Sequence, residues 1–252
     1  MDILKELIRQ AIYEELHEGF EFIDDKTVKF NPATNKYVNT SLGKANFRPR
    51  KTKLKNSEVI VYSAYSKDSG KEVVSILNAM KGNSDVQISK EDVDKFINRT
   101  AIFFTKVLKD RPIDVILKMP SSSPLASNFC DKIIEKLPHS NILTYDNVIT
   151  KDLTNIAVSD ESKFSEKTLQ LVYKFVDKVK TTGNFEIKKV HPKFRRFIIN
   201  WIKIDDSIKN KLVGANVLVV DDYLTTGTTL DETCRTLKLF SPTSIHGITL
   251  IK

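Results

Sequence analysis

The chain has 252 residues, of which 40% are hydrophobic and 9% aromatic, a composition typical of a folded globular protein rather than a disordered one. Its formal net charge of +8 suits binding to nucleic acid, to an anionic membrane surface or to a small polyphosphate, and equally a basic surface that only aids solubility. No apolar run approaches the ~18 residues that span a bilayer, and acidic residues interrupt the N-terminal segment, which argues against a signal peptide. We therefore expect a soluble, cytoplasmic protein with no membrane partner.

Residues 1–85 combine helical and extended patterns, which predict an α+β appendage or cap to which the sequence assigns no role. Apolar residues recur at helical spacing from Ile3 to Leu16, and the polar residues 31–56, rich in Pro, Asn and Gly, predict a loop. The other elements predicted here are strands over 20–24, 27–30 and 58–66 and a helix over 69–80.

From residue 86 onward, helical and strand patterns alternate. Ser89 and Asp92 have the spacing of a capping box, which predicts the start of a helix. Strands are predicted over 113–119, 141–145, 216–220 and 244–251, and helices over 125–137, the second half of 152–184, and 228–240. Apolar strands that alternate with helices predict an α/β domain over 86–252, with a mostly parallel sheet flanked by helices.

The two cysteines, Cys130 and Cys234, are far apart in the chain, and neither belongs to a C-x-x-C pair. A zinc site or a disulfide framework therefore has no support in the sequence. Both lie in apparent helical patterns, and we expect buried thiols in a reducing compartment.

Two adjacent carboxylates, Asp221 and Asp222, follow the apolar strand Val217–Val220. In a parallel sheet this strand end opens into the ligand crevice, whereas a buried strand interior would not tolerate the charges. Carboxylates accept hydrogen bonds well from paired sugar hydroxyls, and they also bind magnesium together with substrate phosphate oxygens. A sugar diol, magnesium or both are the expected ligands.

A threonine-rich turn, Thr225-Thr226-Gly227-Thr228-Thr229, joins this strand end to the next predicted helix. Gly227 permits a backbone conformation that points successive N–H groups into one concavity, and the helix N-terminus adds further donors. The turn therefore predicts an anion site sized for one phosphate. With the diol site a few residues away, the pair fits a ribose 5-phosphate.

Three other interpretations compete for these residues. A receiver domain also opens on such an acid pair, but it needs several further elements, and only thirty residues follow Asp222. An ATPase-type acid strand would need a G-x-x-x-x-G-K-[ST] loop, which the chain lacks. In the simplest interpretation, Asp-Asp and Thr-Gly only form a turn.

The stretch Leu218–Leu230, LVVDDYLTTGTTL, resembles the phosphoribosyl pyrophosphate (PRPP) signature of the type I phosphoribosyltransferases. The resemblance implies that Asp221 and Asp222 bind the ribose hydroxyls and magnesium, and that Thr225, Thr226, Gly227, Thr228 and Thr229 bind the 5-phosphate. Some purine-using members carry an acid/base aspartate at the position of Thr225, and its absence here argues against that subclass.

The family also binds pyrophosphate through the turn after an earlier strand, which the resemblance places at Lys118, Ser121 and Ser122. Lys118 offers a positive charge, and the serines offer hydroxyl and N–H donors ahead of a helix N-terminus. The alternative is an ordinary Ser/Pro turn in which Ser123 caps the helix.

A basic segment lies between the two sites, and in the family a mobile segment at this stage of the chain often brings cations to the leaving pyrophosphate. Its cations are Lys188, Lys189, Lys193, Arg195 and Arg196. A solvated basic strand or a nucleic-acid contact explains the same charges equally well. The motif around Asp221, with Arg196 and Asn200 upstream, is also similar to the ComF-like branch, although the four-cysteine zinc module of that branch is missing.

The resemblance implies a magnesium-dependent transfer of ribose 5-phosphate from PRPP to a nitrogen acceptor, most simply a nucleobase, with release of pyrophosphate. No residue can be assigned as the catalytic base. The alternatives are a regulatory module that binds PRPP or a nucleotide without catalysis, and a ComF-like protein with a nucleic-acid-related role. A homodimer and a nucleic-acid partner stay open.

Overall fold

A computed structural model describes residues 19–31, 38–40, 50–67, 71–121, 123–137 and 141–252. The helix predicted between Ile3 and Leu16 lies outside these ranges. The helices are α2 (Lys71–Met80), α3 (Lys90–Leu108), α4 (Leu125–Lys136), α5 (Glu166–Thr182), α6 (Pro192–Arg195), α7 (Lys209–Leu212) and α8 (Thr228–Lys238), with short 3₁₀ turns η2 (Glu161–Lys163), η3 (Ile187–Lys189) and η4 (Asp206–Ile208). None of the helices in the described ranges is both long and apolar enough to cross a membrane.

The strands fall into one large sheet and several small ones. They are β1 (Gly19–Phe22), β2 (Thr27–Asn31), β3 (Val38–Thr40), β4 (Arg50–Lys53), β5 (Ile60–Lys67), β6 (Gln87–Ile88), β7 (Val115–Lys118), β8 (Leu143–Tyr145), β9 (Ile149–Lys151), β10 (Ala157–Val158), β11 (Ile198–Ile199), β12 (Ile202–Ile204), β13 (Asn216–Tyr223) and β14 (Ser244–Ile251). Among these strands, seven form the large sheet in the order β3-β5-β14-β13-β7-β8, with β4 also paired to β5.

The strand β13 lies inside the large sheet, between β7 and β14, and is parallel to both. Val219 is opposite Leu117 on one side and Gly247 on the other. Such a strand is covered on both faces, which explains its uninterrupted apolar run. The predicted α/β fold with a mostly parallel sheet flanked by helices is confirmed; among its described strands, only β3 and β4 pair in the antiparallel sense.

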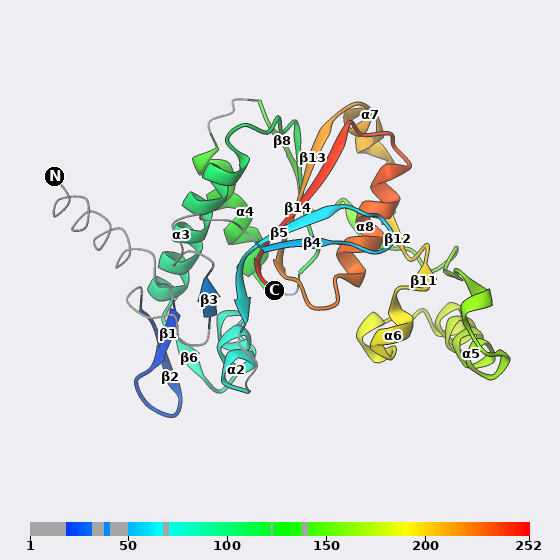
Figure 1. Cartoon of the computed structure of the whole chain (residues 1–252), viewed down its shortest axis with the longest axis horizontal. Coiled ribbons are helices and arrows are strands. Elements are labelled where there is room, and N and C mark those ends of the chain that lie inside the picture. The colour runs from blue at the N-terminus through cyan, green and yellow to red at the C-terminus, as the bar shows by residue number, and fades with distance from the viewer. Residues whose placement is uncertain (1–18, 32–37, 41–49, 68–70, 122, 138–140) are drawn as a thin grey trace, which may run out of the picture.

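Alternate side chains of β13 enter two different hydrophobic clusters. Leu218 and Val220 pack with side chains of α2, α3 and α4. Val217 and Val219 instead pack with side chains of α8 and of the segment 149–204. We call residues 149–204 the cover segment; it contains β9 to β12, α5 and α6. Figure 1 shows α3 and α4 on one side of the sheet and α8 on the other, with α5 and α6 farther out beyond α8.

One part of the sequence prediction is wrong. The polar stretch predicted as a loop over residues 31–56 contains β3 and β4, which pair antiparallel with β5. Lysine and arginine are tolerated in β4 because it lies at the edge of the sheet, where charged side chains reach solvent and also discourage pairing with other chains.

The domain boundary near residue 85 stays a prediction, but the large sheet takes strands from both sides of it. The strand β5 pairs in parallel with β14. In addition, Phe20 and Phe30 pack on Phe96 of α3 within one cluster. The N-terminal strands and the C-terminal region therefore share a core.

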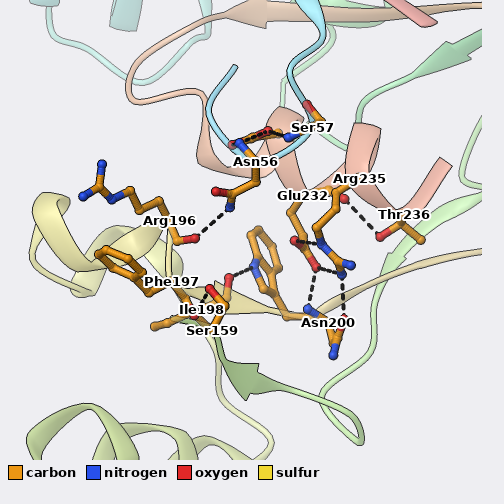
Figure 2. Close-up of polar contacts among 12 residues, drawn as sticks. Asn56, Ser57, Ser159, Arg196, Phe197, Ile198, Asn200, Glu232, Arg235 and Thr236 are labelled. Atoms are coloured by element: carbon orange, nitrogen blue, oxygen red, sulfur yellow. Dashed lines mark hydrogen bonds and ion pairs between the residues drawn. The ribbon is translucent and has the colours of Figure 1, made fainter. Parts of the chain in front are cut away.

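Two adjacent carboxylates of α8 hold neighbouring parts of the chain, as Figure 2 shows in part. Asp231 accepts hydrogen bonds from the backbone N–H groups of Asn56 (2.9 Å) and Ser57 (2.7 Å), in the turn between β4 and β5. Glu232, only 2% exposed, accepts from the backbone N–H of Asn200 in the cover segment and from the guanidinium of Arg235. These two carboxylates of α8 thus fix the β4–β5 turn and the cover segment relative to the threonine-rich turn that precedes α8.

Replacement of Glu232 tests this anchoring. Glu232→Ala removes the carboxylate partner of the Arg235 guanidinium and leaves the N–H of Asn200 without its acceptor, and we expect a loss of about 3 kcal/mol in the free energy of unfolding. The control is Glu135→Ala, which removes an exposed carboxylate from a pair with Lys132 on α4 and should cost less than ~1 kcal/mol. Denaturant unfolding measures both, and equal losses would contradict the anchoring role.

Candidate active site

The two carboxylates at the end of β13 point to opposite faces of the sheet, as neighbours in a strand must. Asp221 lines a cleft of about 800 Å³ on the side of α8 and the cover segment. Asp222 is 5% exposed and lies on the other side, where Lys81 Nζ, just after α2, is 2.8 Å from both of its carboxylate oxygens. The structure therefore brings only Asp221 to the cleft.

The threonine-rich turn has the geometry predicted from its glycine. Gly227 has φ = 72°, in the left-handed region, and α8 begins at the next residue. All five residues from Thr225 to Thr229 line the same cleft as Asp221. The hydroxyls of Thr226 and Thr228 are hydrogen-bonded to each other at 2.9 Å, so one of these two O–H groups is left to donate to a ligand beside the first N–H groups of the helix.

The predicted pyrophosphate residues are only partly assembled. Ser121 lines the cleft, and Ser122 lies outside the described residues. Lys118 does not line the cleft, because its ammonium group bonds to Asp131 (2.8 Å) and Asp146 (3.1 Å). These two carboxylates raise the pKa of Lys118 against the opposing effect of burial. Its role at pyrophosphate therefore stays a prediction that the geometry does not favour.

The alternative for this turn, a helix cap by Ser123, is wrong. The N-cap residue of α4 is Pro124, and the N-terminus has no side-chain cap. The buried Ser123 hydroxyl has no hydrogen-bond partner among the residues that the structure describes. It is a spare donor beside the loop that carries Ser121.

Among the described side chains of the basic segment, which leave out Lys188, one predicted cation lines the cleft. It is Arg195, whose Nε donates to the carbonyl of Val190. Lys189 instead pairs with Glu186, and Lys193 lies over the ring of Phe194. Sequence reasoning missed the cleft residues of β9 and β12, Lys151 and Ile202 among them. No motif marks these residues; the antiparallel pairing of β9 with β12 brings them to the cleft.

Burial and the neighbouring charge of Asp222 raise the pKa of Asp221 from its ordinary value of 3.8 to about 7. The carboxyl group is therefore about half protonated near neutral pH. A bound cation or a diol that donates hydrogen bonds would favour the charged form and lower this pKa.

The described residues contain no group of three or more His, Cys, Asp or Glu side chains that could hold a metal by themselves. Magnesium does not require one, because it is often held by one or two carboxylates together with substrate phosphates and water. Asp221 is the carboxylate of the acid pair that faces the cleft, so it fits a magnesium ion that arrives with a polyphosphate.

Replacement of Gly227 by a residue with a side chain is expected to lower the stability of the protein for two reasons. A Cβ at this position would lie 3.0 Å from Leu54 Cδ2 and 3.2 Å from Leu224 Cδ1, in addition to the unfavourable positive φ. Gly227→Ala should therefore cost about 2–3 kcal/mol in unfolding free energy. The matched control is Gly214→Ala, which has φ = 71° and no atom within 4 Å, and should cost about 1 kcal/mol. Equal losses would show that the contacts with Leu54 and Leu224 do not matter.

The raised pKa of Asp221 predicts a pH-dependent effect of Asp221→Asn. Between about pH 4 and 7 the folded protein keeps a proton that the unfolded chain releases, so this carboxyl lowers wild-type stability as the pH rises through that range. The unfolding free energy of the variant relative to that of wild type should rise by about 2 kcal/mol from pH 5 to pH 8. Thermal and denaturant unfolding at both pH values measure the gain; a constant difference would contradict the shift. The exposed Asp110→Asn serves as control.

Comparison with known proteins assigns the C-terminal half of the chain. The phosphoribosyl transferase domain family matches residues 128–252. Two crystal structures of a hypoxanthine phosphoribosyltransferase from Staphylococcus aureus, in orthorhombic and tetragonal space groups, are similar at 18% identity, with TM-scores of 0.34 and 0.32. The similarity covers 65% of this chain and 65% of theirs. No curated protein matches. Residues 128–252, with the Leu218–Leu230 signature inside them, belong to the phosphoribosyltransferase family.

Proposed function

We propose that the protein is a magnesium-dependent phosphoribosyltransferase that moves the ribose 5-phosphate of PRPP to a nitrogen acceptor, a nucleobase or similar compound, and releases pyrophosphate. The observation that carries the proposal is that Asp221 and Thr225–Thr229 line one cleft. The cleft thus combines a carboxylate that can accept hydrogen bonds from sugar hydroxyls with N–H and hydroxyl groups that can donate hydrogen bonds to a phosphate. Ser121, in the turn after β7, lies on the same cleft.

In this reaction the bond from C1 of the ribose to a pyrophosphate oxygen breaks, and a bond from C1 to the acceptor nitrogen forms. Positive charge develops on the sugar ring and negative charge on the leaving group, so catalysis depends on positioning and on donors around the departing oxygens. Asp221 would hold the ribose hydroxyls, Thr225–Thr229 the 5-phosphate, and Ser121 the pyrophosphate. Bound magnesium would neutralise charge on the polyphosphate.

The cover segment supplies an apolar wall that suits a planar acceptor. Ile149, Ile187 and Ile202 line the cleft beside Trp201, whose indole is almost fully buried and donates to the carbonyl of Ile198. A largely apolar pocket with a few polar groups is the usual environment for a small-molecule ligand. The acceptor is therefore proposed to bind between the cover segment and β13.

A second candidate is a module that binds PRPP without transferring it. Two observations favour it: Lys118 is neutralised by Asp131 and Asp146 away from the cleft, and Asp222 is paired with Lys81. A site with fewer cations around the leaving group would retain the ligand but stabilise its departure less.

Calorimetry with PRPP and magnesium, combined with a pyrophosphate-release assay over a panel of nucleobases, decides between the two. We expect turnover with at least one base, and a loss of about 10–100-fold in kcat/KM for Asp221→Asn, because a charge-assisted hydrogen bond to the sugar is removed. Asp110→Asn, on the exposed surface, should behave as wild type. PRPP binding without turnover on any base would support the binding module, and absence of PRPP binding would refute both candidates.

A further inference from the structure

A second pocket, of about 220 Å³, lies on another face of the threonine-rich turn. Leu224–Thr228 line both this pocket and the main cleft, so the turn forms a wall shared by the two. The rest of the pocket comes from Thr52–Lys55, Arg196, Asp231 and Lys252. We call this set of residues the basic pocket. It lies below the ~300 Å³ at which small-molecule sites usually begin, and so suits a small group.

Positive charge in the basic pocket is not balanced within the described structure. Lys53 pairs with Glu58, but no described carboxylate pairs with Lys55, Arg196 or Lys252. Asp231, the acid in the lining, already accepts hydrogen bonds from two backbone N–H groups of the β4–β5 turn. Three cations therefore share a small space with one carboxylate, Asp231, whose described bonds go to backbone N–H groups, so the described lining keeps an excess of positive charge.

Two of these cations are held in place by contacts other than ion pairs. The guanidinium of Arg196 lies 4.6 Å from the ring centre of Phe197, and its backbone carbonyl accepts from Asn56 Nδ2 at 2.7 Å; the latter bond is drawn in Figure 2. Lys252 Nζ donates to Thr52 Oγ1 at 2.7 Å. Burial and the charge of Arg50 lower the pKa of Lys252, as expected for an ammonium group that lacks an anion.

We propose that the basic pocket binds a phosphoryl group other than the 5-phosphate in the cleft. Clustered cations with unused donors match the several acceptor oxygens of a phosphoryl group, and Arg196 offers the planar fork that such groups prefer. The inference rests on the proposed function only in that it assigns the cleft face of the turn to PRPP. The phosphoryl group is either free phosphate or part of an oligonucleotide, since the exposed Arg50 and Lys51 of β4 extend the positive surface.

The test is calorimetric titration of the full chain with inorganic phosphate at constant ionic strength, with and without saturating PRPP, beside titration with a short single-stranded oligonucleotide. The pocket variant is Lys55→Gln with Arg196→Gln. The matched control, Lys174→Gln with Lys178→Gln, removes the same charge from exposed positions of α5. We expect phosphate to bind the wild type with PRPP present, and the pocket variant to lose about tenfold or more in affinity. The control should change less than twofold, and PRPP affinity should be unchanged in both variants.

Three results would overturn the proposal: an equal loss in the control, abolition of phosphate binding by PRPP, or a parallel loss of PRPP affinity in the pocket variant. The last would show that these cations belong to the site for the 5-phosphate. A loss restricted to the oligonucleotide would identify nucleic acid as the source of the phosphoryl group, and a loss restricted to phosphate a small anion. If the double variant does not fold, Lys252→Gln replaces it. Failure of wild-type PRPP binding would refute the proposed function separately.

Discussion

The geometry of the candidate site depends on two hydrogen-bonded carboxylates at the start of α8. Asp231 fixes the turn between β4 and β5, and Glu232 fixes the cover segment at Asn200. Both lie within one turn of the threonine-rich loop, so the loop, the cover segment and the sheet edge are held by one short piece of helix. A phosphate site made of backbone donors requires such support, because its donors cannot adjust individually.

Strand alternation divides the acid pair between two environments. Asp221 faces the cleft and carries a raised pKa, whereas Asp222 faces α2 and is paired with Lys81. Two like charges are tolerated side by side because Asp222 is paired with the partly buried ammonium group of Lys81 and Asp221 can take up a proton. The acid pair is thus a structural element of the sheet as well as a candidate ligand set.

The local part of the site was predictable, because the strand, acid pair, turn and helix of Leu218–Leu230 are contiguous and each has its own sequence signal. Contacts between distant segments were not predictable. Asp231 accepts a hydrogen bond from Asn56, 175 residues away in the sequence, and Glu232 accepts one from Asn200, 32 residues away. The contacts of Lys118 were not predictable for the same reason, since its partners are Asp131 in α4 and Asp146 just after β8; its role at pyrophosphate stays a prediction. The strand β4 escaped prediction because edge pairing overrides its charged composition.

The pair formed by Lys81 and Asp222 has a thermodynamic consequence for the N-terminal region. Lys81 follows α2, whose apolar side packs with β1, β2 and α3 in one cluster. Any ligand that binds Asp222 must compete with the ammonium group of Lys81. By linkage, the factor by which such a ligand shifts the position of α2 equals the factor by which that shift of α2 changes the affinity for the ligand. Residues before α3 can therefore change the ligand affinity of a site that is built almost entirely from residues of the C-terminal half of the chain.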